Sequence, residues 1–466
     1  MKIVFYFTLF LFCSQLCFSQ SFVGYETDNF NGIHGILVNP GNTAYQKNKA
    51  EVNLFSFGGT STNDFFQQSV FDIFDGNFDI TKLNSRASNE NIVFENSEVV
   101  GPSFVLDLDP KKFSVALFSK LRKISNYNSV NGDLFLSIEN NFPNNDFDIN
   151  QENFHGTTHA WGELGASFGH ILVDRLINGN EKHLLKAGVT LKWLRGIGIG
   201  IGYSNNITGE YSTDDTQLNL NGDFSYLEKG IQNSGLEDFI KETSGQGVGM
   251  DLGFSYEWQT RKSIKEDDRK EDYRALNQYR LKVGVSVLDI GRIDYGNAFL
   301  KNYALNGPIT NNAFESAANF TDILNDYLVI PSTEGKLKIQ LPTRVRAEVD
   351  FKIKPFIYAN IVHNQSIVKS NTLYNNYVTS STTLTARYET RKLSAYLPIT
   401  ISQYGTIDLI ESNGLDVGLG INIFGFVHIG SGSVISNLIT TKNARANTAN
   451  FYCGLKIPIS YNILDK

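Results

Sequence analysis

The sequence has little cysteine, tryptophan, methionine and proline, and beyond its first residues it lacks long hydrophobic runs. Its 466 residues include 3 Cys, 3 Trp, 2 Met and 10 Pro. So few cysteines argue against a small domain held together by disulfides. No later stretch has the ~18 consecutive apolar residues of a transmembrane helix, so a mature chain embedded in a membrane would have to be a β-barrel.

A strong charge of one sign is also missing. The formal net charge is -7, from 41 Lys and Arg against 48 Asp and Glu, and the acidic residues are spread along the chain. Without a basic patch, we expect no binding of nucleic acid. The length would permit several soluble domains, but no low-complexity linker separates them, so we expect one unit.

The first 19 residues have the features of a secretory signal peptide. Lys2 precedes an apolar run over residues 3–12, and the small residues Cys17 and Ser19 stand before Gln20. This run is too short to anchor the chain in a membrane, and we expect cleavage after residue 19 and export. The exported chain would keep only Cys453 and could form no internal disulfide.

The most regular stretch present is 343–354, where apolar and charged residues alternate. Because successive side chains of a strand point to opposite faces, this pattern predicts a β-strand with one apolar and one charged face. At ~3.3 Å per residue the strand would be ~35 Å long, longer than most strands of soluble domains. The apolar face holds Val345, Ala347, Val349, Phe351 and Ile353, and the charged face holds Arg344, Arg346, Glu348, Asp350, Lys352 and Lys354.

Two architectures fit this strand and its successor at 356–367, which follows a tight turn at Lys354-Pro355. One is a transmembrane β-barrel hairpin, with ~9 to 11 residues per crossing. The other is a hairpin of a soluble β-sandwich, whose charged face meets water. The signal peptide and the alternation of short turns with long polar loops along much of the chain favour the barrel.

The remaining strand-like segments support the same fold class. We predict an all-β fold, a closed antiparallel transmembrane β-barrel of about 14 strands, with roughly 12 to 16 compatible with the boundaries. Residues 50–466 would form the barrel, and a turn-rich segment over residues 20–49 would precede it. Weak helical spacing predicts two short loop helices, at 226–243 and 311–330. The long polar stretches at 60–98 and 121–159 are predicted to be excursions between strands. The other predicted strands lie at 50–58, 99–108, 112–120, 161–173, 184–194, 196–203, 248–258, 279–290, 382–388, 393–402, 416–423, 426–432 and 450–461.

Several short motifs resemble a Bacteroidota family of outer-membrane β-barrels of unknown function. They are Asn39-Pro40-Gly41 before the first strand, Leu341-Pro342-Thr343, Tyr396-Leu397-Pro398-Ile399 and the glycine-rich hairpin at 414–432. That family is similar in turn to the fatty-acid transporter FadL and to the PorV component of type IX secretion. The resemblance implies fourteen strands and an N-terminal plug, here residues 20–49, marked by an Asn-Pro-Ala motif. Gly41 replaces the usual Ala.

Residue patterns of catalysis or metal binding are weak. His155 and His159 are the only closely spaced histidines, and no glutamate accompanies them as in zinc proteases. No Gly-x-Ser-x-Gly elbow joins a strand to a helix. We therefore expect no enzyme activity, no metal site and no cofactor.

Two functional hypotheses remain. In the first, the barrel is FadL-like and transports a hydrophobic or amphiphilic small molecule. The charged ladder Arg344, Arg346, Glu348, Asp350 and Lys352 would then face the lumen and hold the plug. In the second, the barrel is PorV-like and does not transport, and its long extracellular loops bind a surface or secretion protein. The expected surroundings of the barrel are outer-membrane lipids in both cases.

The location of the protein tests the fold class. We expect cell fractionation to recover the mature protein in the outer membrane, and we expect unheated samples to migrate differently from boiled samples on a gel, because closed barrels resist unfolding by detergent. Recovery in the soluble periplasm would instead support the β-sandwich.

Overall fold

A single antiparallel sheet dominates the described part of the chain. The computed structural model describes residues 21–64, 87–139, 146–177, 181–230, 244–260, 277–310, 328–369, 374–403, 413–439 and 447–460. The strands are β1 (Ala50–Asn63), β2 (Asn91–Val100), β3 (Ser103–Asp109), β4 (Phe113–Val130), β5 (Phe147–Ile177), β6 (Glu181–Ser212), β7 (Gln217–Lys229), β8 (Gly245–Thr260), β9 (Tyr279–Thr310), β10 (Leu328–Gln340), β11 (Arg344–Lys354), β12 (Ile357–Ser366), β13 (Ser380–Glu389), β14 (Leu393–Gln403), β15 (Asn413–Val417), β16 (Leu419–Ile423), β17 (Val427–Ser431) and β18 (Asn447–Ile459).

The helices in the described residues are short. They are the 3₁₀ helices η2 (Tyr25–Thr27) and η3 (Pro40–Thr43) and the α-helices α2 (Ile33–Val38), α4 (Gly132–Glu139) and α9 (Val434–Ile439). Among the residues described, no helix is both long enough and apolar enough to cross a membrane.

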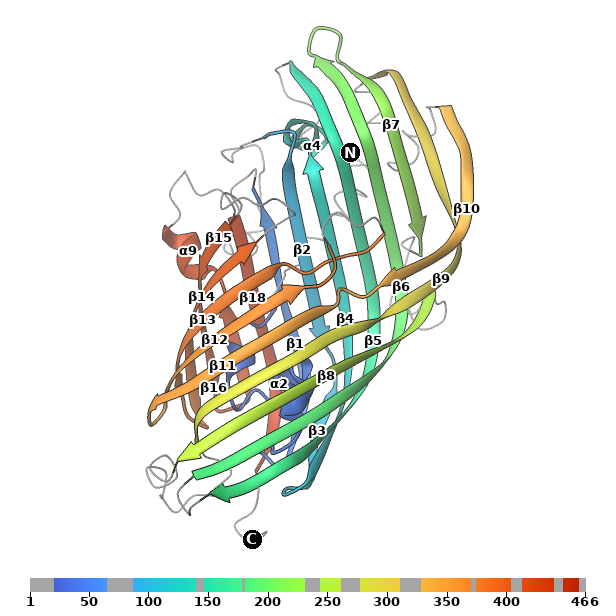
Figure 1. The fold of residues 1–466 in the computed structure, drawn as a ribbon. Coiled ribbons are helices and arrows are strands. Elements are labelled where there is room, and N and C mark those ends of the chain that lie inside the picture. Colours follow the sequence, from blue (N-terminus) through green and yellow to red (C-terminus); the bar gives the residue numbers. More distant parts are fainter. Residues whose placement is uncertain are drawn as a thin grey trace.

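The sheet closes on itself because β1 pairs with β18. Neighbours in sequence are neighbours around the sheet, and all pairs are antiparallel. Four of the fourteen barrel strands consist of two consecutive segments that share a neighbour. These are β2 with β3, β7 with β8, β10 with β11 and β15 with β16. The predicted closed barrel of about 14 strands is therefore confirmed (Figure 1).

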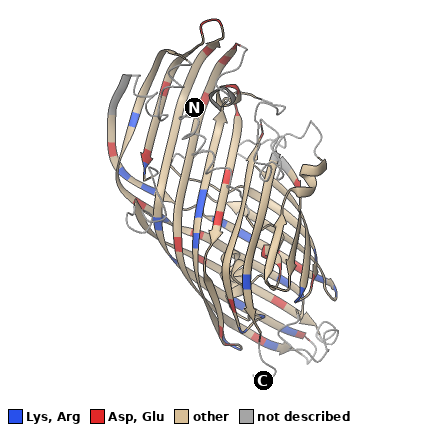
Figure 2. Ribbon diagram, turned by 180° about the vertical axis from the view of Figure 1, so that it is seen from behind, with Lys and Arg blue, Asp and Glu red and all other residues tan. Residues whose placement is uncertain are grey.

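The two faces of the strands differ in the way that a barrel in lipid requires. Along β11, Arg346, Glu348, Asp350 and Lys352 are buried, whereas Val349, Phe351 and Ile353 are exposed. Exposed apolar side chains continue around the outer surface, for example Leu117, Leu164, Leu191, Phe254, Ile361, Leu397 and Leu455. An apolar outer band around a polar interior is the arrangement of transmembrane barrels. Charged residues lie on many neighbouring strands (Figure 2).

The two ends of the barrel are unequal. At one end the turns after β3, β11, β13 and β16 are short. At the other end most connections are longer, except the four residues between β6 and β7, and β5, β6, β7, β9 and β10 extend well beyond β11 to β17 (Figure 1). The longest, β5, β6 and β9, have 31, 32 and 32 residues.

The predicted loop helix at 226–243 is wrong over its described part. Residues up to Lys229 belong to β7, which pairs with β6 and β9. Leu227 packs into an apolar cluster inside the barrel, and this burial with the backbone pairing overrides weak helical spacing. Of the second predicted helix at 311–330, residues from Leu328 are in β10, and the rest lies outside the described residues.

The polar stretches at 60–98 and 121–159 were predicted as loops, but they contain strands. β4 continues to Val130, β5 begins at Phe147, β1 reaches Asn63 and β2 begins at Asn91. Many polar residues of these strands face inward, where they find hydrogen-bond partners. Asn126, for example, accepts from the backbone N–H of Tyr377 at 3.0 Å. From the sequence alone, a strand with a polar inner face resembles a loop, because the groups that bond to that face inside the barrel are not known.

Val349 tests the assignment of the outer face. Val349→Arg would place a charge in hydrocarbon, which costs about 2 to 4 kcal/mol near the middle of the bilayer. We expect a much smaller folded, heat-modifiable fraction for Val349→Arg than for the control Val349→Leu, when both are measured on gels after refolding into lipid vesicles. Equal folding of the two variants would mean that this face does not meet lipid.

Candidate functional site

The N-terminal segment, residues 21–49, lies against the inner face of the barrel. Phe22, Tyr25, Ile33 and Ile36 form a buried cluster with wall residues such as Tyr396 and Tyr452. His34 lies in the same region, where its Nε2 is 3.0 Å from Ser56 Oγ. Burial, together with the nearby Lys456 and Lys120, holds the pKa of His34 well below its usual range, so the ring is neutral.

The motif Asn39-Pro40-Gly41 makes a tight turn against the wall. Asn39 caps η3, because its Oδ1 accepts from the Gly41 N–H at 2.9 Å, and its Nδ2 donates to the Phe254 carbonyl at 3.0 Å. A Cβ on Gly41 would lie 3.0 Å from the Phe254 carbonyl carbon, closer than an alanine is normally accommodated. Glycine in place of the usual alanine thus fits the close approach here. A function of this motif as a plug stays a prediction.

Three wall glycines make room for this turn, and the sequence analysis missed them. A Cβ at Gly188 would lie 2.0 Å from the Pro40 carbonyl oxygen, and one at Gly253 would lie 2.9 Å from the Pro40 ring. A Cβ at Gly169 would lie 2.5 Å from the Ala44 nitrogen. Glycines inside regular strands often mark such close approaches, and that signal could have identified them.

The predicted ladder on β11 contacts charged and polar partners in the lumen. Arg346 is 2.6 Å from Glu26 of the N-terminal segment and 3.4 Å from Glu348. Lys282 approaches Glu348 at 3.6 Å, and Lys352 donates to the carbonyl of Asn277 at 2.8 Å. Arg346 is thus the ladder residue with a direct ion pair to the N-terminal segment, while Glu348 and Lys352 contact the wall. Whether the ladder retains the segment stays a prediction.

Asp350 belongs to a second group of buried charges. Arg387 of β13 lies 2.7 Å from Asp350 and 3.0 Å from Glu389. Tyr279 donates to Asp350, and Asn29 of the N-terminal segment donates to Glu389 at 2.9 Å. This network connects the segment to three wall strands that are far apart in sequence.

A third group of charges lies on the adjoining strands of the wall. Lys192 is 2.8 Å from both Asp251 and Asp289, and Arg122 is 2.8 Å from Asp289 and 3.3 Å from Glu163. These residues come from β4, β5, β6, β8 and β9. Together the three groups form a belt of ion pairs across the lumen, which an apolar molecule could enter only by separating charges.

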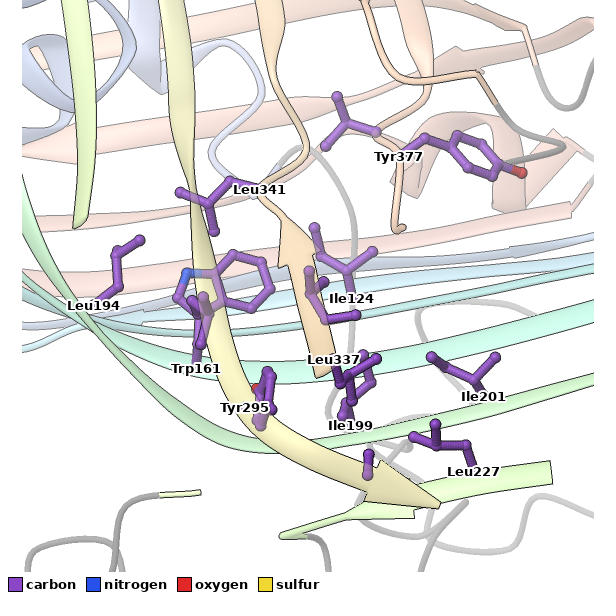
Figure 3. Close-up of a cluster of buried hydrophobic side chains, with 14 of the residues drawn as sticks. Ile124, Trp161, Leu194, Ile199, Ile201, Leu227, Tyr295, Leu337, Leu341 and Tyr377 are labelled. Atoms are coloured by element: carbon purple, nitrogen blue, oxygen red, sulfur yellow. The ribbon is translucent and has the colours of Figure 1, made fainter. Parts of the chain in front are cut away.

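Above this belt, part of the lumen is apolar. A buried cluster includes Ile124, Trp161, Leu194, Ile199, Ile201, Leu227, Ile293, Tyr295, Ala298, Leu337, Ile339, Leu341 and Tyr377 (Figure 3). A second cluster follows the same tall strands further out, with Ile149, Ile207, Tyr211, Leu218, Phe224, Tyr303, Leu305 and Ile309. The two clusters line successive parts of one wall.

The connection from β12 to β13 turns into the lumen and caps the belt. Asn376 donates to the carbonyls of Ile124 and Thr157, at 3.2 and 3.0 Å. The Tyr377 hydroxyl donates to Asn128 at 2.9 Å. The N-terminal segment and this connection thus both occupy part of the described lumen.

The wall is interrupted beside the apolar cluster. Within the described stretches, β8 pairs with β9 as far as Asp294 and β7 pairs with it from Lys301 onward, so residues 295–300 have no described strand partner on that side. The Lys229 Nζ of β7 donates to the Asn297 carbonyl there. Gly230 is the last described residue after β7 and Ser244 is the first described residue before β8, and the Ser244 Oγ donates to the Ile197 carbonyl at 2.9 Å. Residues 231–243 lie outside the described part.

Both histidines of the closely spaced pair contact uncharged polar side chains. His159 Nε2 is 2.8 Å from the Tyr295 hydroxyl, and His155 Nε2 is 3.2 Å from Asn128 Nδ2. No group of three or more potential ligands of the types His, Cys, Asp and Glu is assembled within the described stretches. The expected absence of metal, cofactor and catalysis stays a prediction.

This architecture, a closed fourteen-stranded barrel with an apolar exterior and ion pairs inside, defines the class as an outer-membrane type of β-barrel. The chain belongs to the family DUF5723, a family of unknown function, whose match covers residues 40–428.

Solved structures with a similar arrangement include two toluene transporters. The chain is 10% identical to TbuX of Ralstonia pickettii, with 94% of this chain and 97% of that chain covered and a TM-score of 0.47. For TodX of Pseudomonas putida the identity is 10%, the coverage 93% and 95%, and the TM-score 0.42. The translocator domain of NalP from Neisseria meningitidis gives 8% identity, 87% and 88% coverage and a TM-score of 0.32. At these identities and TM-scores, the similarity implies no shared substrate or partner. No curated protein matches the chain.

The buried charges allow a stability test. Arg387→Met would leave Asp350 and Glu389 without their cation, and breaking a buried pair in this way costs about 3 to 5 kcal/mol. Lys338→Met removes an exposed pair with Asp294 and should cost under about 1 kcal/mol. We expect urea titrations in detergent to show this difference between the two variants in the free energy of unfolding. Similar losses for both variants would show that the Arg387 network contributes little.

Proposed function

We propose that this protein is exported by a cleaved signal peptide at residues 1–19 and resides in the outer membrane. There it transfers a hydrophobic or amphiphilic small molecule, with residues 20–49 acting as the plug. The observation that carries the proposal is the interruption of the wall directly beside a buried apolar cluster. Ile199, Leu227, Tyr295 and Ala298 belong to that cluster and flank the interruption on β6, β7 and β9.

The distribution of polarity supports a lateral route. An apolar solute that moves along the two clusters contacts apolar side chains throughout, and its transfer from water to these contacts is favourable. Further descent would require it to separate the buried ion pairs of the belt. A path through the interrupted wall avoids this barrier. The exposed Val248 and Phe299 lie near the interruption on the outer surface and provide an apolar exit.

Uptake measurements test this proposal. Ala298→Arg would place a charge inside the cluster at the interruption, and Asn297→Arg would place the same charge on an exposed neighbouring position. We expect cells that express the wild type or Asn297→Arg to accumulate radiolabelled toluene or a medium-chain fatty acid faster than cells without the protein. Ala298→Arg should abolish this gain at matched amounts of folded barrel.

Two outcomes would contradict parts of this proposal. The wild type could give no gain over empty cells for any apolar probe, or Ala298→Arg could transport as well as Asn297→Arg. The second result would leave the barrel a transporter but would reject the lateral route.

A PorV-like role in binding a protein is the second candidate, and the upper wall favours it. Within the described stretches, β10 pairs with the strand β9 alone, and beyond the contact of Gln340 with Asn375 its other edge would be the place for a partner strand to pair. Ser332 to Lys336 are exposed along this edge. A photo-crosslinking residue at Lys336 in growing cells should capture one defined surface protein if this role holds. Absence of any adduct, together with uptake of apolar probes, would reject it.

A further inference from the structure

A small polar cavity lies where three parts of the molecule meet. It has a volume of about 50 Å³ and is enclosed by the N-terminal segment, by the wall strands β2, β4, β11 and β12, and by the end of the inward β12–β13 connection. This volume accommodates a few water molecules or one small oxyanion, but not an extended aliphatic chain. The cavity is separate from the wall interruption.

Among the charged side chains of its lining, cations outnumber carboxylates. Lys120, Arg122, Arg344 and Arg346 line the cavity, against two carboxylates, Glu26 and Glu98. Both carboxylates are already engaged, because Glu26 pairs with Arg346 and Glu98 with Lys120.

Arg344 differs from its three cationic neighbours. Arg122 has its own carboxylate partners outside the cavity lining. No ion pair or side-chain hydrogen bond to Arg344 occurs within the described stretches, and its Nε is buried without a partner. Arg344 is only half-buried, but its Nε is shielded from water and has no acceptor, so this position favours a bound hydrogen-bond acceptor with a negative charge.

Further donors with no hydrogen-bond partner in the described stretches border the same space. The Nε of Arg346 and the Oγ1 of Thr379 are both buried, and the two residues are 2% and 5% exposed. Thr379 belongs to the inward connection, and Arg344 and Arg346 belong to β11. A planar guanidinium with adjacent N–H and O–H donors is the arrangement that binds carboxylate or phosphate.

We propose that this cavity is an oxyanion site, in which Arg344, Arg346 and Thr379 bind a carboxylate or phosphate group. The bound anion would link the N-terminal segment to β11 and to the inward connection, because residues of all three line the cavity. The proposal does not depend on transport, since either a free anion or the head group of an amphiphile has the required chemistry.

Thermal unfolding of the purified barrel tests this site. The protein is refolded in detergent with the anion present, so that access to the closed lumen does not limit binding. Inorganic phosphate is one probe and dodecyl phosphate the other, with chloride at equal ionic strength as the reference. Because a ligand that binds the folded state alone raises Tm, we expect a saturable increase for the wild type. Arg344→Gln should lose it, whereas Arg292→Gln, on an exposed position of β9, should keep it.

The two probes distinguish the sources of the anion. If inorganic phosphate raises Tm and Arg344 is required for this increase, the ligand is a free anion. If only dodecyl phosphate raises Tm and Arg344 is required, the ligand is the head group of an amphiphile. If neither probe gives an increase that requires Arg344, the proposal is wrong.

A second variant covers the case in which Arg344→Gln does not fold. Thr379→Leu fills the cavity with an apolar side chain and leaves every charge in place. We expect it to remove the increase as well. If Thr379→Leu shows the same increase in Tm as the wild type, the anion does not bind in this cavity and the proposal is wrong.

Discussion

The pairing of buried charges is the constraint on which the rest of this structure depends. A charge removed from water is strongly unfavourable unless an opposite charge and hydrogen bonds replace the solvent. The inner face of this barrel presents acidic and basic residues that are almost fully buried, among them Arg387, Glu389, Lys456 and Glu51. They are tolerated because strands distant in sequence bring opposite charges together. Lys456 and Glu51, for example, meet at 2.9 Å across the closing pair β1 and β18.

The N-terminal segment is a part of this pairing rather than an independent domain. Glu26 completes the environment of Arg346, and Asn29 donates to Glu389. Lys456 also donates to the Phe30 carbonyl. If the segment left the lumen, these groups would lose partners at the same time. Movement of the segment is therefore coupled to rehydration of the belt, and close packing against Gly188 and Gly253 adds to the barrier.

The sequence predicts the barrel well and the site only in part. The alternation in β11 is a strong signal because one face is charged at every position, and this alone indicates which residues share a face. Pairings such as Arg387 with Asp350 depend on the register between β11, β12 and β13, which no local pattern contains. The upper halves of β4 and β5 were mistaken for loops for a related reason. Their inward side chains are polar because the inward connection at Asn376 and Tyr377 bonds to them.

The breaks in the strands explain how the upper lumen comes to be filled. At Leu341-Pro342-Thr343 the strand divides: β10 continues along β9, and β11 pairs with both β9 and β12. Proline cannot donate to a sheet ladder, so it is well placed at such a division. The chain after β12 then passes the point where β10 and β11 separate. There Ile367 donates to the Thr343 carbonyl and Gln340 donates to Asn375. The division of one strand thus brings the inward connection over the charged belt.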